Sequence, residues 1–249
     1  GKKIQVKRSS VVPVLADLEN CKVEQPRESY GHPLCSLEVS EYIQTSLRFK
    51  GVMCLEDLAK WTYEDFKRIR GLGPLKIGKI LEKLKQYGIL FGIASGRPVE
   101  TVRAMLKEWQ IEDSVSFIMG MNGGVLYDLR QRTKEEYHLL DGEVVLDIIH
   151  FFEDLDVDFW ILEGATRYTN RTSIETQEHA RIFGETEIEI DLEPYLLNNT
   201  CNKLIIHCDK EYMPIVLERA KQYKNEACVG FLTADNLFEY VDPRINKGY

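Results

Sequence analysis

The chain has 249 residues, a net charge of −8 at neutral pH and 44% hydrophobic residues. This composition is typical of a globular protein and excludes collagen-like and disordered chains. No apolar run approaches the roughly 18 residues of a membrane span, and no signal peptide is evident, so we expect no membrane contact and a cytoplasmic location.

The charge is divided unevenly along the chain. Residues 1–88 contain 16 basic and 11 acidic side chains, whereas residues 89–249 contain 16 and 29. Such asymmetry indicates different tasks for the two parts. The acidic part disfavours nucleic-acid binding, and the mildly basic part remains a candidate for it.

The six cysteines show no C-x-x-C spacing. This pattern predicts buried free thiols in a reducing compartment rather than a disulfide framework. It gives no set of metal ligands, so the metal site is unknown from the sequence.

Residues 1–33 contain Lys, Ser, Pro and Glu with little periodicity, which predicts an arm or linker. From 34 to 88 the pattern is helical. Val39, Ile43 and Leu47 recur at helical spacing, and Thr62 begins a further helix as in a capping box. An all-α module is therefore expected over 34–88.

A helix, a Gly-x-Gly turn and a second helix follow one another around Gly71 and Gly73. This pattern predicts a helix-hairpin-helix, in which the backbone and the next helix's amides approach a nucleic-acid phosphate. The candidate nucleic-acid-binding residues are Gly71, Gly73 and Lys76.

Residues 34–88 resemble the C-terminal domain of the bacterial RNA polymerase α subunit, as in the stretch Lys67-Arg68-Ile69-Arg70-Gly71-Leu72-Gly73. The resemblance implies DNA contact by an Arg and an Asn on the first helix. Here Tyr42 and Thr45 occupy those positions, so only the Gly73 backbone and Lys76 correspond. DNA contact and a protein-docking role both remain open for this module.

The second part begins with a buried strand expected at 89–91, which places Ser95 at its carboxyl end. Pro98 predicts the start of a helix, with Val102 and Leu106 on its apolar face. A hydroxyl residue, a Gly-Arg turn and a helix N-terminus together provide donors for an anion.

Residues from about 80 to 249 resemble the Cof-type phosphatases of the haloacid dehalogenase superfamily. The resemblance lies in Ser95-Gly96-Arg97, Asn122-Gly123-Gly124 and Asn246-Lys247-Gly248, in that order. It implies that Ser95 and Lys247 bind and neutralise a transferring phosphoryl group. It also implies substrate-binding roles for Gly96, Arg97, Asn122 and Gly123, and Mg²⁺ as cofactor.

The same resemblance implies a nucleophilic Asp-x-Asp motif, which does not occur before Ser95, and an acidic motif beyond Lys247, where the sequence stops. Asp17, at the end of an apolar run and followed by Glu19, is the candidate substitute nucleophile. Pro13 within that run argues against a central strand there. We therefore expect an incomplete or inactive phosphatase.

The resemblance implies an α/β fold: a partial Rossmann-like core, formed by residues 89–132 and 237–249, and a large α/β cap over residues 133–236. Within the cap we expect helices at 142–155, 176–183 and 211–223 and strands at 157–162, 202–208 and 227–232. Glu163, Arg167 and Lys203 are candidate substrate selectors in the cap.

Two functions follow from these patterns. The first is a phosphomonoesterase acting on a phosphorylated small molecule, of the sugar phosphate or nucleotide class. The alternative is a non-catalytic binding protein whose residues 34–88 dock DNA or a protein of the transcription machinery. The sequence does not show whether the chain is a natural fusion, a fragment or a chimera, although a chimera or fragment is the less favoured origin.

Overall fold

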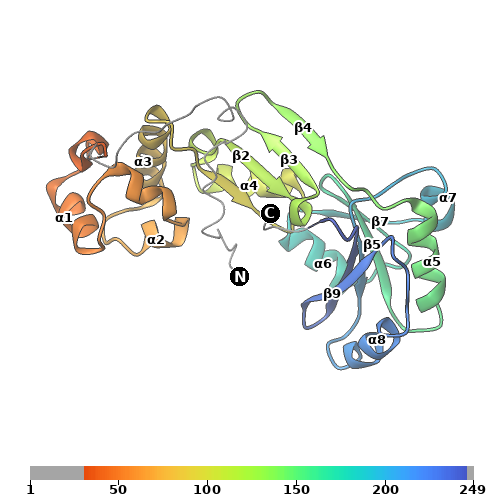
Figure 1. The fold of residues 1–249 in the computed structure, drawn as a ribbon. Coiled ribbons are helices and arrows are strands. Elements are labelled where there is room, and N and C mark those ends of the chain that lie inside the picture. Colours follow the sequence, from red (N-terminus) through yellow and green to blue (C-terminus); the bar gives the residue numbers. More distant parts are fainter. Residues whose placement is uncertain (1–30, 246–249) are drawn as a thin grey trace.

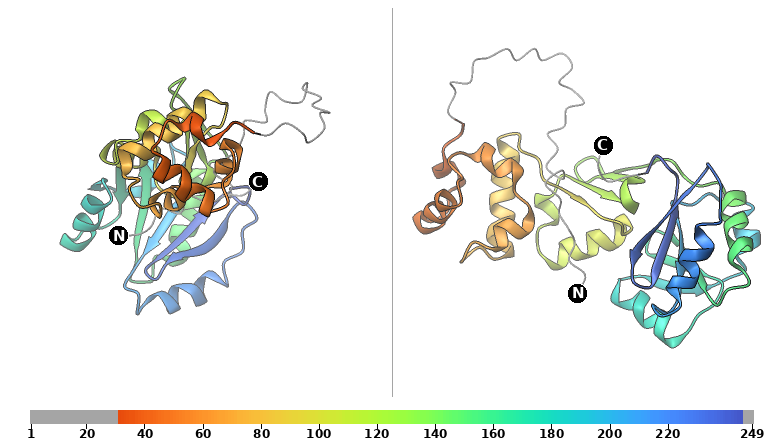
Figure 2. Two further views of the ribbon diagram at one scale, coloured as in Figure 1. Left: turned by 90° about the vertical axis from the view of Figure 1, so that its left-hand side faces the viewer. Right: turned by 60° about the horizontal axis from the view of Figure 1, so that its bottom comes forward.

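The structure is a computed structural model that describes residues 31–245. Three parts follow one another along the molecule: a helical module, a four-stranded sheet and a six-stranded sheet (Figures 1 and 2). Within these residues, none of the helices has the length and apolar character that crossing a bilayer requires.

The helical module contains three α-helices and two short 3-10 helices. These are 3-10 Leu34–Leu37, α1 Glu41–Phe49, 3-10 Leu55–Lys60, α2 Tyr63–Lys67 and α3 Pro74–Gln86. The Thr62 hydroxyl accepts the Asp65 amide at 3.2 Å and the Asp65 carboxylate accepts the Thr62 amide at 3.0 Å, which confirms the capping box. The helical elements expected over 34–88 are therefore present.

The middle part is a four-stranded sheet of order β1-β2-β3-β4. The strands are β1 Gly92–Ala94, β2 Phe117–Gly120, β3 Val125–Asp128 and β4 Thr133–Glu136; α4 is Val99–Glu108, and 3-10 helices span Glu112–Ser114 and Met121–Gly123. Only the β1–β2 pair is parallel. The first strand begins three residues later than the 89–91 run predicted, but Ser95 still follows its carboxyl end.

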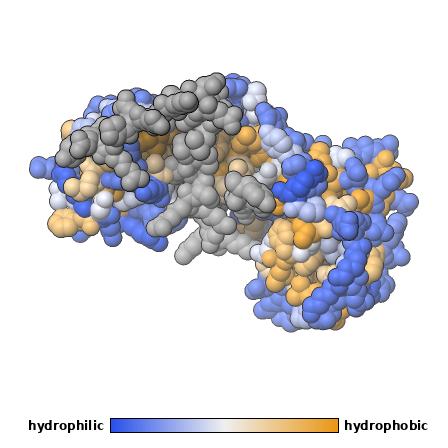
Figure 3. All heavy atoms as spheres, in the orientation of Figure 1, coloured by the Kyte–Doolittle hydropathy of each residue, from blue (hydrophilic) through white to orange (hydrophobic). Residues whose placement is uncertain are grey.

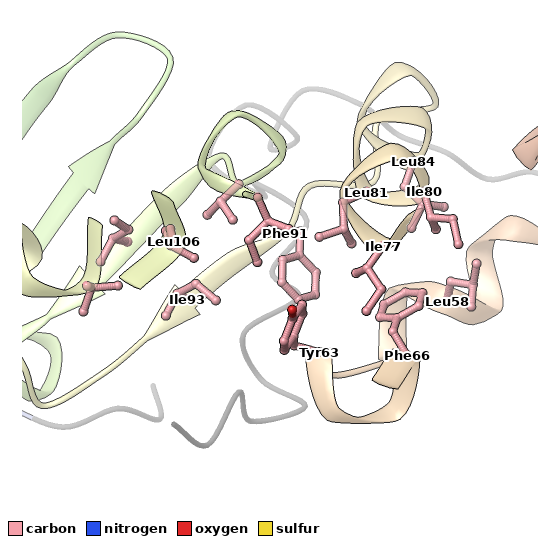
Figure 4. Close-up of a cluster of buried hydrophobic side chains, with 14 of the residues drawn as sticks. Leu58, Tyr63, Phe66, Ile77, Ile80, Leu81, Leu84, Phe91, Ile93 and Leu106 are labelled. Atoms are coloured by element: carbon pink, nitrogen blue, oxygen red, sulfur yellow. The ribbon is translucent and has the colours of Figure 1, made fainter. Parts of the chain in front are cut away.

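The helical module and the four-stranded sheet share one hydrophobic core. Figure 4 shows Phe91 and Tyr63 between Ile93 on the sheet side and Ile77 and other side chains of α3. Phe91 and Ile93 are only 4% and 1% exposed. The module is therefore packed onto the sheet rather than tethered to it.

The third part is a six-stranded sheet of order β7-β6-β5-β8-β10-β9. The strands are β5 Asp158–Glu163, β6 Thr166–Thr169, β7 Thr186–Glu189, β8 Leu204–His207, β9 Val229–Ala234 and β10 Leu237–Val241; the helices are α5 Gly142–Phe152, α6 Ile174–Ile182, α7 Leu192–Leu196 and α8 Met213–Ala220. One face of this sheet packs with α5, α7 and α8 in a second hydrophobic core.

The opposite face of the six-stranded sheet turns toward the first core. Trp160, Leu162 and Ile205 on that face belong to the cluster that β1, β2 and the helical module form. Alternation along the strands explains this division, since successive side chains point to opposite faces. The candidate site lies on this inner face.

The position of β10 corrects the expected division of the chain. Residues from 237 onward were assigned to the core, but β10 pairs antiparallel with β8 and β9 of the six-stranded sheet. Conversely, β4 pairs with β3, so residues 133–136 extend the four-stranded sheet rather than the cap. The chain thus passes from the four-stranded sheet to the six-stranded sheet between Glu136 and Asp158.

Candidate active site

Ser95 sits directly after β1, buried at 8% exposure. Its amide donates to the Met119 carbonyl at 2.8 Å, continuing the sheet, so this amide does not serve a ligand. Its hydroxyl oxygen accepts the Arg97 amide at 3.1 Å. Within residues 31–245, no group accepts a hydrogen bond from this hydroxyl. The hydroxyl is therefore available to donate a hydrogen bond to a bound anion.

Asn122 shapes the wall beside Ser95. It adopts a left-handed conformation at φ 61°, and its amide donates to the Ser95 carbonyl at 3.1 Å. A Cβ on Gly96 would lie 2.7 Å from the Asn122 Oδ1, so only glycine fits at 96 without displacing Asn122. Gly123, also at positive φ, completes the turn.

A buried ion pair joins the inner face of the six-stranded sheet to this loop. The Lys203 ammonium donates to the Glu239 Oε1 at 3.0 Å and to the Gly96 carbonyl at 3.1 Å. The Glu239 Oε2 accepts the Asn122 side-chain amide at 2.8 Å. We call Lys203, Glu239, Gly96 and Asn122 the Lys203–Glu239 clamp, since their hydrogen bonds connect the two sheets next to Ser95.

Arg97 points from the four-stranded sheet toward α6. Its guanidinium lies 4.4 Å from the Phe183 ring centre and donates to the Met105 sulfur at 3.3 Å. Burial lowers its pKa, and the charge of Glu185 opposes that shift. Arg97 forms no ion pair with a carboxylate of residues 31–245, which leaves its charge for a ligand.

Arg167 is buried on the same face, but its guanidinium is already paired with carboxylates of the protein. It pairs with Glu185 and, at 3.3 Å, with Glu187, and its guanidinium lies 3.9 Å from the Trp160 ring centre. The geometry therefore makes Arg167 a structural cation that fixes the wall of the site.

These side chains enclose a cavity of about 500 Å³ between the β1 end and the inner face of the six-stranded sheet. Ser95, Gly96, Arg97, Asn122, Lys203 and Glu239 are among the residues that line it. A volume of this size suits a small molecule. Arg167 and Lys203 are neutralised by buried carboxylates, so among the described residues of the lining the Arg97 guanidinium is the cation that remains to attract an anion.

The remaining predicted residues fall elsewhere. Glu163 is exposed, accepts the Tyr195 hydroxyl at 3.1 Å and does not line this cavity. Asp17 and Lys247 lie outside the described residues. Glu239 was missed by the sequence analysis, because a lone Glu among apolar residues of a strand gives no sign of its distant partners.

The described residues do not fit a magnesium site. No group of three or more His, Cys, Asp or Glu side chains within residues 31–245 could hold a metal. Glu239 is bound by Lys203 and Asn122, and Asp242 accepts Arg244 at 2.7 Å. Any Mg²⁺ ligands must therefore include residues outside this range.

The candidate nucleic-acid residues lie at the start of α3. Gly71 has a positive φ of 89°, Gly73 precedes the helix, and the Lys76 ammonium donates to the Gly71 carbonyl at 3.0 Å. The turn is formed as expected, but the Lys76 ammonium is hydrogen-bonded to the turn itself rather than extended into solvent. A nucleic-acid role for these residues stays a prediction.

Comparison with protein families gives a clear match. The model of a family described as haloacid dehalogenase-like hydrolase matches residues 74–249, well over half of the chain. A search of functionally characterised proteins finds no match.

Solved structures of this family share the fold. A haloacid dehalogenase-like hydrolase from Bacteroides thetaiotaomicron is 20% identical, with a TM-score of 0.57 over 67% of this chain and 63% of its own. One from B. subtilis is 15% identical, with 0.55 over 67% and 66%. A subclass IIB sugar phosphatase is 16% identical, with 0.54 over 73% and 66%. The chain thus spans less than two thirds of the length of each.

Proposed function

The chain belongs to the haloacid dehalogenase-like hydrolase family, and we propose that it hydrolyses phosphomonoesters of small molecules in the cavity above Ser95. The observation that carries this proposal is the Ser95 hydroxyl. It is buried at a strand end, it accepts the Arg97 amide, and it is free to donate into a cavity that the Arg97 guanidinium also lines. Such a hydroxyl is suited to donate to a phosphoryl oxygen.

Asp17 is the proposed nucleophile. In the described part of the chain, β1 pairs only with β2, so its other edge can accept a further strand. Asp17 lies outside the described residues, and its assignment rests on the family resemblance, which requires a nucleophilic Asp, and on the apolar run that precedes it in the sequence.

Lys247 is the proposed counter-charge. Ile245 is buried, and its side chain lies 3.4 Å from the position of a Cβ on Gly124, directly after the Asn122 turn. Lys247 follows Ile245 by two residues in the sequence, and the family resemblance assigns it this role.

The proposed chemistry needs a nucleophile, an acid and charge neutralisation. An Asp17 carboxylate oxygen would form a bond to phosphorus while the bond from phosphorus to the ester oxygen breaks, and Glu19 would give that oxygen a proton. Water would then cleave the aspartyl phosphate, giving its proton back to Glu19 and releasing inorganic phosphate. Ser95 would hold a phosphoryl oxygen throughout.

Turnover of 4-nitrophenyl phosphate by the full chain, with and without Mg²⁺, tests the proposal. We expect Ser95→Ala to lower kcat/KM by about 10- to 100-fold, the effect of losing a hydrogen bond to a charged group. Asp17→Asn should abolish turnover, and Ser46→Ala, on α1, should change nothing. Turnover that survives Asp17→Asn would refute the nucleophile, and indifference to Ser95→Ala would refute the site.

A further inference from the structure

Trp160 carries a buried hydrogen-bond donor that the described part of the chain does not use. Its side chain lies on the inner face of β5, opposite Ile205 of β8, and it lines the cavity. The residue is 1% exposed, and its indole Nε1 has no hydrogen-bond partner within residues 31–245. A buried N–H without an acceptor is costly. Because an indole N–H can only donate, a ligand that supplies an acceptor would remove this cost.

The Trp160 ring is held in place from both sides. The Arg167 guanidinium lies 3.9 Å from the ring centre, and the His207 imidazole stacks on the ring at 4.3 Å with an interplanar angle of 17°. Arg167 comes from β6 and His207 from β8, the two neighbours of β5 in the sheet. Asp158 holds His207 in turn, with Oδ2 3.0 Å from Nδ1. Since protein groups cover the ring faces, the ring edge that bears the N–H remains for a ligand.

Arg97 is the second open donor of the cavity. Its guanidinium has several N–H groups, and among the described residues their acceptor is the Met105 sulfur, a weak one. Stacked rings connect Arg97 with Trp160. The Arg97 guanidinium lies 4.4 Å from the Phe183 ring centre, Phe183 lies 4.4 Å from His179, and His179 lies 5.5 Å from Trp160. Both donors therefore lie on the side of the cavity that α6 borders.

The carboxylates that line the cavity already bind cations of the protein. Glu239 pairs with Lys203, and Glu185 pairs with Arg167. The open side chains near α6 are thus donors. A sugar hydroxyl placed there would need an acceptor for its own proton, whereas a carboxylate only accepts. The single charge of a carboxylate also matches the single unpaired cation, Arg97.

We infer that the substrate is a phosphate ester whose leaving group carries a carboxylate, which accepts the Trp160 N–H and pairs with Arg97. This inference rests on the proposed function, since it takes the phosphate to lie at Ser95 with Lys247 as its counter-charge. The cavity of about 500 Å³ has room for both ends of such a molecule. Trp160 is then a specificity-determining residue, because a buried donor rejects an analogue that lacks its acceptor.

Calorimetric titration of the full chain with matched phosphonates tests the inference. Phosphonoacetate, 3-phosphonopropionate and 4-phosphonobutyrate place a carboxylate at increasing distance from the phosphonate, and the matching alkyl phosphonates carry a methyl group instead. We expect at least one acid to bind about tenfold or more tightly than its alkyl partner. Trp160→Phe keeps a ring but removes the N–H, so it should weaken that acid by about tenfold and leave the alkyl partner unchanged. Trp109→Phe, in a ring stacked on Tyr63 away from the cavity, should change neither.

The indole signals in the ¹⁵N NMR spectrum give a second readout, which needs no stable variant. The chain has three tryptophans, and a new hydrogen bond moves an indole proton to lower field. We expect one signal to move with the acid but not with its alkyl partner, and Trp160→Phe should remove that signal. Hydrophobic surface gathers at the end of the molecule that carries β9 (Figures 1 and 3). Adhesion outside the cavity is therefore checked with Ser95→Ala, which should weaken both probes.

The outcomes separate the two proposals. Equal affinities of each acid and its alkyl partner, with both weakened by Ser95→Ala, would overturn the carboxylate and leave the phosphate site in place. Tighter binding of an acid that neither moves the Trp160 signal nor responds to Trp160→Phe would overturn the role of Trp160. Absence of binding by every probe, or binding that is indifferent to Ser95→Ala, would overturn both proposals.

Discussion

Removing one partner of the Lys203–Glu239 clamp should destabilise the protein far more than removing both. The two side chains are 4% and 8% exposed and lie 3.0 Å apart. Lys203→Met leaves the Glu239 carboxylate buried with only Asn122 and Thr233 to bind it. Uncompensated buried charge of this kind costs about 3–5 kcal/mol of unfolding free energy. Replacing both side chains by Met removes both charges, and such exchanges cost little or even stabilise.

The measurement is urea unfolding followed by circular dichroism, for the two single variants and the double variant. We expect the double variant to be more stable than Lys203→Met alone, by about 2 kcal/mol or more. Lys221→Met removes one partner of an exposed pair with Glu218 and is the matched control, with little effect expected. Additive losses in the double variant would refute the reasoning, because they would mean that the two charges do not compensate each other.

Three further predictions concern packing, pH and thiol chemistry. Phe91→Ala should lower the free energy of unfolding in urea by about 3–5 kcal/mol, because the Phe91 ring packs between the helical module and the four-stranded sheet. A loss below about 1 kcal/mol would contradict that packing. Burial alone would raise the pKa of Asp158, but hydrogen bonds from His207 and Arg171 lower it overall. Its contribution to stability is therefore present above about pH 3.9, the unfolded value, and lost as pH falls through the lower folded pKa; Asp158→Asn should flatten this part of the stability profile, and an unchanged profile would count against it. Burial raises the pKa of Cys201 to about 12, so iodoacetamide at pH 8 should label it only after unfolding, as mass spectrometry can show; rapid labelling of the folded chain would be inconsistent with its burial.

Local patterns in the sequence predicted most helices well. The periodic apolar residues of α1 and α4 and the Thr62 cap indicate helices that the structure contains, with shifts of a few residues at their ends. Ser95 also lies at a strand end as expected. These features depend on neighbours within one turn or one strand, which a sequence shows directly.

Long-range pairing was less predictable. Phe238 and Tyr240 alternate with Glu239, which indicates a strand with two different faces but not the sheet to which it belongs. Lys203 and Glu239 are 36 residues apart, and each alone is typical of a solvated surface charge. The clamp exists because β8 and β10 are neighbours, and that adjacency is a property of the whole sheet.

Calorimetric titration of the full chain with inorganic phosphate tests the central claim most directly, because it does not depend on turnover. If the Ser95 hydroxyl holds the phosphoryl group, Ser95→Ala should weaken binding by about tenfold or more, while Ser46→Ala leaves it unchanged. Equal affinity of the wild-type chain and Ser95→Ala would contradict the account.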